Sequence, residues 1–137
     1  MPVSHSLRQN LLKIDLIGTY EPEDIVREFV AAMRDPACPI PVALVLDVTR
    51  SESLATRPTP DIRRIAEFLK DYKDRINGRC AVVAESDIHF GLSRLGSAYG
   101  EGVGVEAQVF RDLAGALAWL GVDREARRQG GAQGENP

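Results

Sequence analysis

Two continuous apolar runs mark the centre of the predicted fold. Residues 42–46 and residues 80–84 contain no polar position. A strand that is apolar on both faces is typical of the interior of a parallel sheet that is covered on both sides. We therefore expect these two runs to be neighbouring interior strands that point in the same direction.

Two further runs alternate between apolar and polar or small residues, as strands with one buried face do. In residues 11–17, Lys13 and Asp15 interrupt a series of leucines and isoleucines. Over residues 103–109, valine or alanine at every second position alternates with glycine, glutamate or glutamine. Residues 3–8 are expected to pair with residues 11–17 as an antiparallel strand at the edge of the sheet.

Four segments carry apolar residues at the three-to-four-residue spacing of an amphipathic helix. Pro22 suits the first position of one helix, Thr59 and Ser86 can cap two others, and Gly121 can end the last. We expect these helices at residues 22–34, 61–76, 87–99 and 113–120.

The segments between these elements have loop composition. Residues 36–41 contain three prolines, and residues 49–60 are polar with two prolines. Residues 122–137 have almost no large apolar side chain and are expected to form a disordered tail. One domain is therefore expected over residues 1–121.

The order of the elements predicts the fold class. Strands that alternate with helices across short connections are typical of an α/β protein. We predict a single-domain α/β sandwich with a four- to five-stranded, mostly parallel sheet. It has an antiparallel edge strand and about four helices.

Composition narrows the classes of function. The formal net charge of −3 does not favour a general nucleic-acid binder. No apolar run approaches the ~18 residues that a membrane-spanning helix needs. Cys38 and Cys80 lack the spacing of a zinc or redox motif, and the first residues lack a secretory pattern. We therefore expect a cytoplasmic protein without a metal or a cofactor.

The end of the predicted domain carries a distinctive pattern, in which Phe110-Arg111-Asp112 is followed by Ala116 and Trp119-Leu120. Together with residues 47–49, 61–76, 81–83, 86–87 and 90–92, it resembles the SpoIIAA-like branch of the STAS superfamily. The resemblance covers residues 10–121. It implies a mixed α/β sandwich whose first strand is an antiparallel edge. It also implies a module that binds a regulatory partner protein or a small anionic or lipidic ligand.

One segment departs from the pattern of STAS domains that act as anti-sigma-factor antagonists. Those domains resemble one another in an Asp-Ser-x-Gly segment, whose serine is phosphorylated at the start of a helix. Here residues 47–54 read Asp-Val-Thr-Arg-Ser-Glu-Ser-Leu, and no glycine follows either serine. Ser51 and Ser53 are the candidate phosphorylation sites, with Arg50 as a cation that could pair with a phosphate. The alternative is an ordinary polar loop.

Polar side chains follow both predicted interior strands. Because the carboxyl ends of neighbouring parallel strands meet at one edge of a sheet, the two following loops are expected to share a crevice near a switch in strand order. Arg50 could bind a phosphate or carboxylate there, assisted by backbone N–H groups that begin at Ser86. In the alternative, Ser86 and Asp87 only stabilise a helix start. The candidate ligand-binding residues are Thr49, Arg50, Ser51, Ser53, Ser86, Asp87 and His89.

No motif predicts catalysis. Ser51 and His89, with either Asp47 or Asp87, supply the residue types of a hydrolytic triad, but no G-x-S-x-G turn accompanies them. The sequence therefore favours a non-catalytic binding module. A lipid carrier like the related CRAL-TRIO domains is one alternative, and it requires an apolar cavity. A small hydrolase is another. A homodimer is compatible with an exposed sheet edge or helix face.

Overall fold

The computed structural model describes residues 3–52, 59–87, 90–91, 94 and 104–121. In these residues the elements are β1 (Val3–Arg8), β2 (Leu11–Gly18), α1 (Pro22–Met33), β3 (Ala43–Ser51), α3 (Thr59–Lys70), β4 (Arg79–Val83), β5 (Glu106–Phe110) and α5 (Leu113–Leu120). Asp87, Phe90, Gly91 and Arg94 are helical as well, where a third helix was predicted. The expected tail lies outside the described residues.

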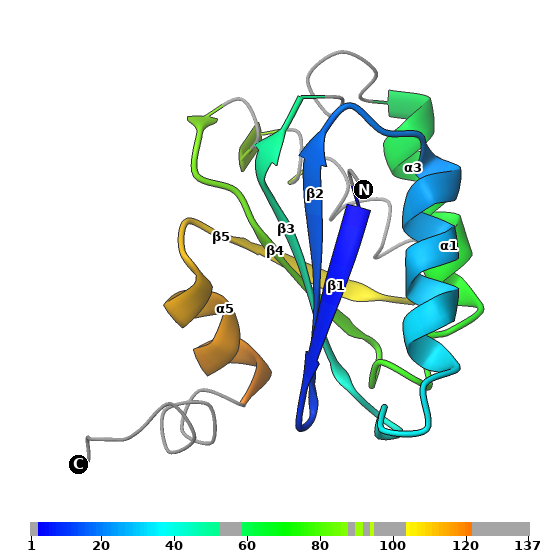
Figure 1. Cartoon of the computed structure of the whole chain (residues 1–137). Coiled ribbons are helices and arrows are strands. Elements are labelled where there is room, and N and C mark those ends of the chain that lie inside the picture. The colour runs from blue at the N-terminus through cyan, green and yellow to red at the C-terminus, as the bar shows by residue number, and fades with distance from the viewer. Residues whose placement is uncertain (1–2, 53–58, 88–89, 92–93, 95–103, 122–137) are drawn as a thin grey trace.

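The five strands form one mixed sheet in the order β1-β2-β3-β4-β5 (Figure 1). β1 pairs with β2 in the antiparallel direction, and the pairs β2–β3, β3–β4 and β4–β5 are parallel. The α/β class, the antiparallel edge strand and the mostly parallel sheet are therefore confirmed. The two continuous apolar runs are indeed neighbours that run the same way.

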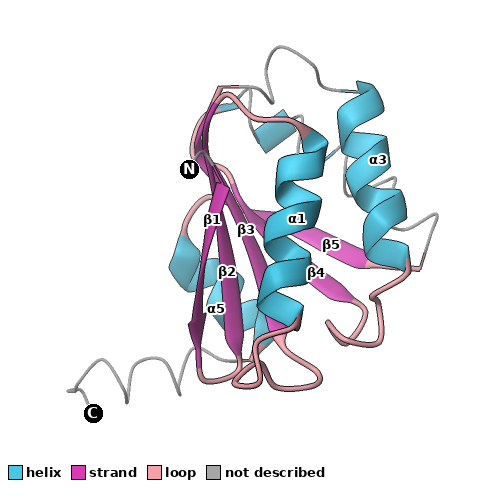
Figure 2. Cartoon of the chain, turned by 45° about the vertical axis from the view of Figure 1, so that its right-hand side comes forward, coloured by secondary structure: helices cyan, strands magenta, loops and turns pink. Residues whose placement is uncertain are grey.

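The described strands follow one another across the sheet in chain order. Right-handed crossovers between successive parallel strands then place their helices on the same face. Figure 2 shows α1 and α3 together on one face, while α5 lies on the other. The order of these five strands does not reverse, so the switch point expected beside the candidate site does not occur among them.

The centre of the sheet is apolar on both faces because it lies between two helical layers. On one face, side chains of all five strands pack against α1 and α3, and Phe29 of α1 contacts the rings of Phe68 and Tyr72 edge-on. On the other face, Val45, Ala81 and Val83 pack against α5. Both layers are needed because β3 and β4 bury apolar side chains in both directions.

Local sequence signals account for several helix ends. Pro22 is the first residue of α1, and the Asp24 carboxylate accepts a hydrogen bond from the Glu21 N–H at 2.9 Å. Asp112 caps α5 by accepting from the Gly115 N–H at 2.8 Å. Gly121 ends α5 with a φ of 82°, as expected of a glycine at a helix C-terminus.

Three predicted boundaries were wrong. β5 begins at Glu106, so residues 104 and 105 do not belong to the last strand. β3 continues to Ser51, so residues 49–51 are strand rather than loop, because β2 is long enough to pair Gly18 with Ser51. The predicted helix over residues 61–76 ends at Lys70. After it, the chain tightens into turns in which the Tyr72 N–H donates to the Leu69 carbonyl.

Arg75 fixes these turns to the rest of the molecule. Its carbonyl accepts from the Val42 N–H at 2.9 Å, and its guanidinium donates to the carbonyl of Met33, the last residue of α1, at 3.1 Å. The side chain thus joins the end of α1 to the segment that leads into β4. A hydrogen bond from a charged donor contributes more than a neutral one.

We predict that Arg75→Met lowers the free energy of unfolding by about 1 kcal/mol, because the Met33 carbonyl loses its charged donor. Lys70→Met, at the exposed end of α3, is the matched control and should change stability by less than about 0.5 kcal/mol. Urea unfolding followed by circular dichroism measures both. Equal losses in the two variants would contradict the assigned role of Arg75.

Candidate functional site

The carboxyl ends of β3 and β4 lie at the same edge of the sheet. Their parallel register pairs Val45 with Ala81 and Asp47 with Val83. β4 leaves the sheet after Val83, which lies opposite Asp47, whereas β3 continues beside β2 as far as Ser51. Ser53 and His89, two of the predicted site residues, lie outside the described residues.

A bulge near the end of β3 decides which side chains face outward. Asp15 pairs with Asp47, but Ile17 pairs with Arg50, so β3 has one more residue than β2 between these positions. The extra residue interrupts the alternation of faces. Ser51 turns into the core and is 4% exposed, whereas Arg50 is exposed to solvent.

The Ser51 hydroxyl lies 2.5 Å from the hydroxyl of Tyr20, and both side chains are buried. Tyr20 belongs to the core between the sheet and the helices α1 and α3. A phosphate on Ser51 would place about two negative charges in this core. Phosphorylation of Ser51 therefore requires the end of β3 to open first, which was not evident from the polar sequence around it.

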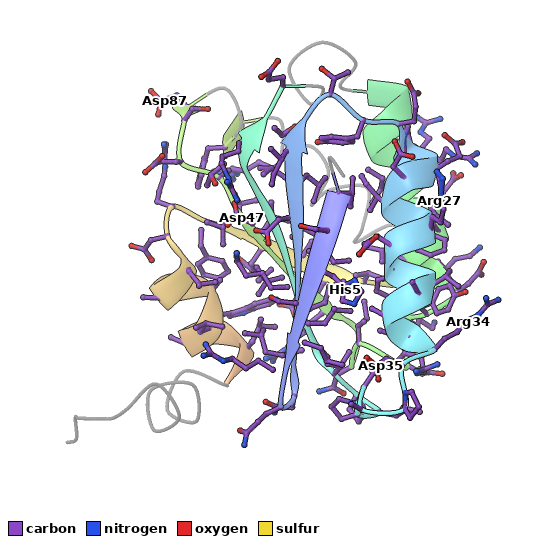
Figure 3. The ribbon with its side chains drawn as sticks, viewed as in Figure 1. His5, Arg27, Arg34, Asp35, Asp47 and Asp87 are labelled. Carbon is purple, nitrogen blue, oxygen red and sulfur yellow. The ribbon has the colours of Figure 1, made fainter. Side chains whose placement is uncertain are left out.

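Thr49 belongs to a polar group on the opposite face of the sheet, which we call the Lys13 cluster: Lys13, Asp15, Asp47 and Thr49. The Lys13 ammonium lies 2.7 Å from Asp15 Oδ1 and 3.5 Å from Asp47 Oδ2. Asp47 Oδ1 accepts from the backbone N–H of Thr49 at 2.9 Å and from its hydroxyl at 2.7 Å. Figure 3 shows Asp47 on the other side of the sheet from His5, which faces α1.

The electrostatics of the Lys13 cluster favour its charged forms. Burial raises the pKa of Asp47, but the two hydrogen bonds from Thr49 and the charge of Lys13 outweigh it, so this pKa is below its usual value. Burial likewise lowers the pKa of Lys13, but Asp15 and Asp47 outweigh it, so this pKa is raised. Thr49 is thus engaged in holding Asp47, while Arg50 forms no ion pair with any described residue.

The segment after β4 is held by Arg111, which is not among the site residues predicted from the sequence. One guanidinium nitrogen of Arg111 donates to the Glu85 carbonyl at 2.9 Å and lies 3.0 Å from Asp87 Oδ1. The same guanidinium stacks over the Phe90 ring, 4.2 Å from its centre. Arg111 directly follows β5, and its position after a strand parallel to β4 is the signal that could have identified it.

Ser86 begins a helical turn, as predicted, since its carbonyl accepts from the Phe90 N–H at 2.8 Å. Asp87 is 94% exposed at its side chain and pairs with Arg111. Thr49, Arg50 and Ser51 therefore lie in the last part of β3, and Ser86 and Asp87 follow the end of β4. Their environments differ: Ser51 is buried, Asp87 is paired and Arg50 is exposed.

The described residues hold no group of three or more histidine, cysteine or acidic side chains that could bind a metal ion. Cys38 and Cys80 are both buried. Burial raises the pKa of the Cys80 thiol to about 12, and burial also raises that of Cys38, with Arg75 acting against it. In both cases burial favours the protonated thiol over the thiolate, which is the nucleophilic form. None of the described helices has the length and apolarity that crossing a membrane requires.

We predict that Asp47→Asn lowers the free energy of unfolding by about 1 kcal/mol at pH 7, because Lys13 loses a charged partner. The lowered pKa of Asp47 means that its carboxylate stabilises the fold above the ordinary value of 3.8. That contribution disappears as the pH falls through the lowered pKa, so the difference between variant and parent should vanish in strong acid.

The measurement is urea unfolding at several pH values between about 2 and 7. Asp74→Asn, in an exposed turn away from the Lys13 cluster, is the control for the change in net charge. A deficit in Asp47→Asn that stays constant over this pH range would contradict the assigned electrostatics.

Comparison with known proteins supports the fold. The sequence matches no protein-family model and no curated protein sequence. Among solved structures, it is similar to an uncharacterized protein of the DUF3478 family from Shewanella loihica PV-4, which is described as having a SpoIIAA-like fold. The TM-score is 0.55 and the identity 15%, over 86% of this chain and 91% of that one. The chain therefore has the SpoIIAA-like α/β fold that the resemblance implied.

Proposed function

We propose that the chain is a non-catalytic, STAS-like module that binds an anionic group at the carboxyl edge of β3 and β4. The anion would belong to a regulatory partner protein or to a small ligand, and a phosphate or carboxylate has the required chemistry. The observation that carries the proposal is the exposure of Arg50 and its lack of an ion pair. Arg50 carries an exposed guanidinium without an ion pair to any described residue, and it lies next to the last residue of β3.

The surroundings of Arg50 support this role. The carboxylate of Asp47, three residues before Arg50 in β3, binds Thr49 and Lys13, and Asp87 pairs with Arg111. These two acidic side chains therefore have other partners, and Arg50 keeps its donors for a ligand. A guanidinium can bind a phosphate or a carboxylate through two parallel hydrogen bonds.

The environment of Ser51 favours binding over hydrolysis. A hydrolytic serine needs an accessible hydroxyl beside a general base. The hydroxyl of Ser51 is buried and lies against Tyr20. Ser51 therefore serves to join the end of β3 to Tyr20 in the core rather than as an exposed nucleophile.

The test is a titration of the ¹⁵N-labelled chain with inorganic phosphate, followed by NMR at constant ionic strength. We expect saturable shifts of the amides in residues 49–52 and 85–87. Arg50→Ala should weaken binding about tenfold or more, because a charge-assisted hydrogen bond contributes about 1.5–3 kcal/mol. Arg34→Ala, which removes an exposed arginine at the end of α1, is the matched control and should leave the titration unchanged.

Two outcomes would contradict the proposal. In one, phosphate causes no larger shifts than chloride does. In the other, Arg50→Ala and Arg34→Ala weaken phosphate binding equally, which would indicate a general response to positive charge rather than a site at Arg50.

A further inference from the structure

β1 lies at one margin of the sheet and pairs with β2 alone among the described strands (Figure 2). The pairing runs through six residues without a shift, from Val3 opposite Leu16 to Arg8 opposite Leu11. The bulge of the sheet lies on the other side of β2. The outer edge of β1 therefore presents a regular row of backbone N–H and C=O groups to which another strand can add.

β1 lacks the features that usually prevent such pairing. Natural edge strands carry proline, lysine, a bulge or a charged residue that points into the pairing region. β1 reads Val-Ser-His-Ser-Leu-Arg, with its one formally charged residue, Arg8, at the end. The other margin, β5, is shorter and carries the exposed carboxylate of Glu106.

The strand is also held in place before any partner arrives. His5 Nδ1 lies 2.5 Å from Glu28 Oε2 of α1, and Val3 is 1% exposed in the core. Gln9, with a φ of 53°, closes the tight turn into β2. An edge that is already ordered loses less conformational entropy when a second strand pairs with it.

We propose that β1 pairs in the antiparallel direction with β1 of a second copy of this chain, so that the two sheets become continuous. A two-fold axis normal to the sheet generates this pairing, and it keeps the α1 and α3 layers of both copies on one face. Residues directly opposite one another then project to the same face. Pairing centred on Ser6 opposes the two Ser6 side chains, and Ser4 faces the partner's Arg8.

The self-complementarity of β1 favours a second copy of this chain as the source of the pairing strand. In the register centred on Ser6, His5 faces the partner's Leu7, and no two like charges are opposed. Ser4 and Ser6 are small polar side chains on the face opposite α1, so a second strand meets no bulky group there. In a register centred on His5, the two imidazoles would face each other, so pairing about Ser6 is favoured.

The interface formed in this way is small. Six residues on each side bury less than the ~800 Å² per partner of a standard stable interface. The dimer should therefore form and dissociate with concentration. This inference does not depend on the anion site, which lies at the carboxyl ends of β3 and β4.

The test is sedimentation velocity of the full chain between about 10 µM and 1 mM, a range that spans weak association. We expect the parent to shift from monomer to dimer. Ser6→Lys should stay monomeric throughout, because two lysines would be directly opposed. Gln108→Lys, at an exposed position on β5, is the matched control and should still dimerise.

Ser6 is exposed, so the lysine should be compatible with the fold, and circular dichroism checks this. Should Ser6→Lys fail to fold, Ser4→Lys serves instead, because it opposes the partner's Arg8. A parent that is monomeric up to 1 mM, or a dimer that survives either lysine on β1, overturns the proposal. So does a dimer that is lost in Gln108→Lys.

Disulfide trapping tests the register. Opposite Cβ atoms in an antiparallel pair are about 4.5–5.5 Å apart, so Ser6→Cys should give a covalent dimer on mild oxidation. Gln108→Cys is the control and should not, while the buried Cys38 and Cys80 do not compete. Cross-linking by His5→Cys in place of Ser6→Cys would overturn the proposed register.

Discussion

The parallel pairing of β3 with β4 is the constraint on which the rest of the structure depends. Both strands bury apolar side chains on both faces, so the sheet needs helices on each side. Parallel neighbours also require a crossover, which places α3 between them in the chain and on the same face as α1. The same pairing sets the end of β4 opposite Asp47, and β3 continues beyond it along β2 to Arg50 and Ser51.

A single extra residue in β3 decides which side chains at its carboxyl end face the core and which face solvent. Because side chains alternate with a period of two along a strand, an insertion of one residue exchanges the inward and outward faces beyond it. The bulge sends Ser51 to Tyr20 in the core and leaves Arg50 exposed. On the face opposite α1 and α3, before the bulge, Lys13 lies between Asp15 and Asp47, so one cation compensates two half-buried carboxylates.

Much of the candidate site could be predicted from the position of polar residues after apolar strands. That rule predicts Arg50 and Asp87 beyond the carboxyl ends of two parallel strands, because strand direction follows from the α/β order. It could not predict which of these side chains is buried, paired or free of an ion pair. Asp87 pairs with Arg111, a residue 24 positions later in the sequence, and such a contact depends on how β5 lies against β4.

The sequence by itself determined the elements, the neighbouring parallel strands and the antiparallel edge, because hydrophobic periodicity and helix-ending residues act locally. Only the tertiary structure decided where β3 ends, that α3 stops at Lys70, and which side chains at the edge are buried. Each of these depends on a partner distant in the chain: Gly18 for the end of β3, and Val42 for the turns after α3. Local patterns do not encode such pairings, since the register of a strand is fixed by its neighbour.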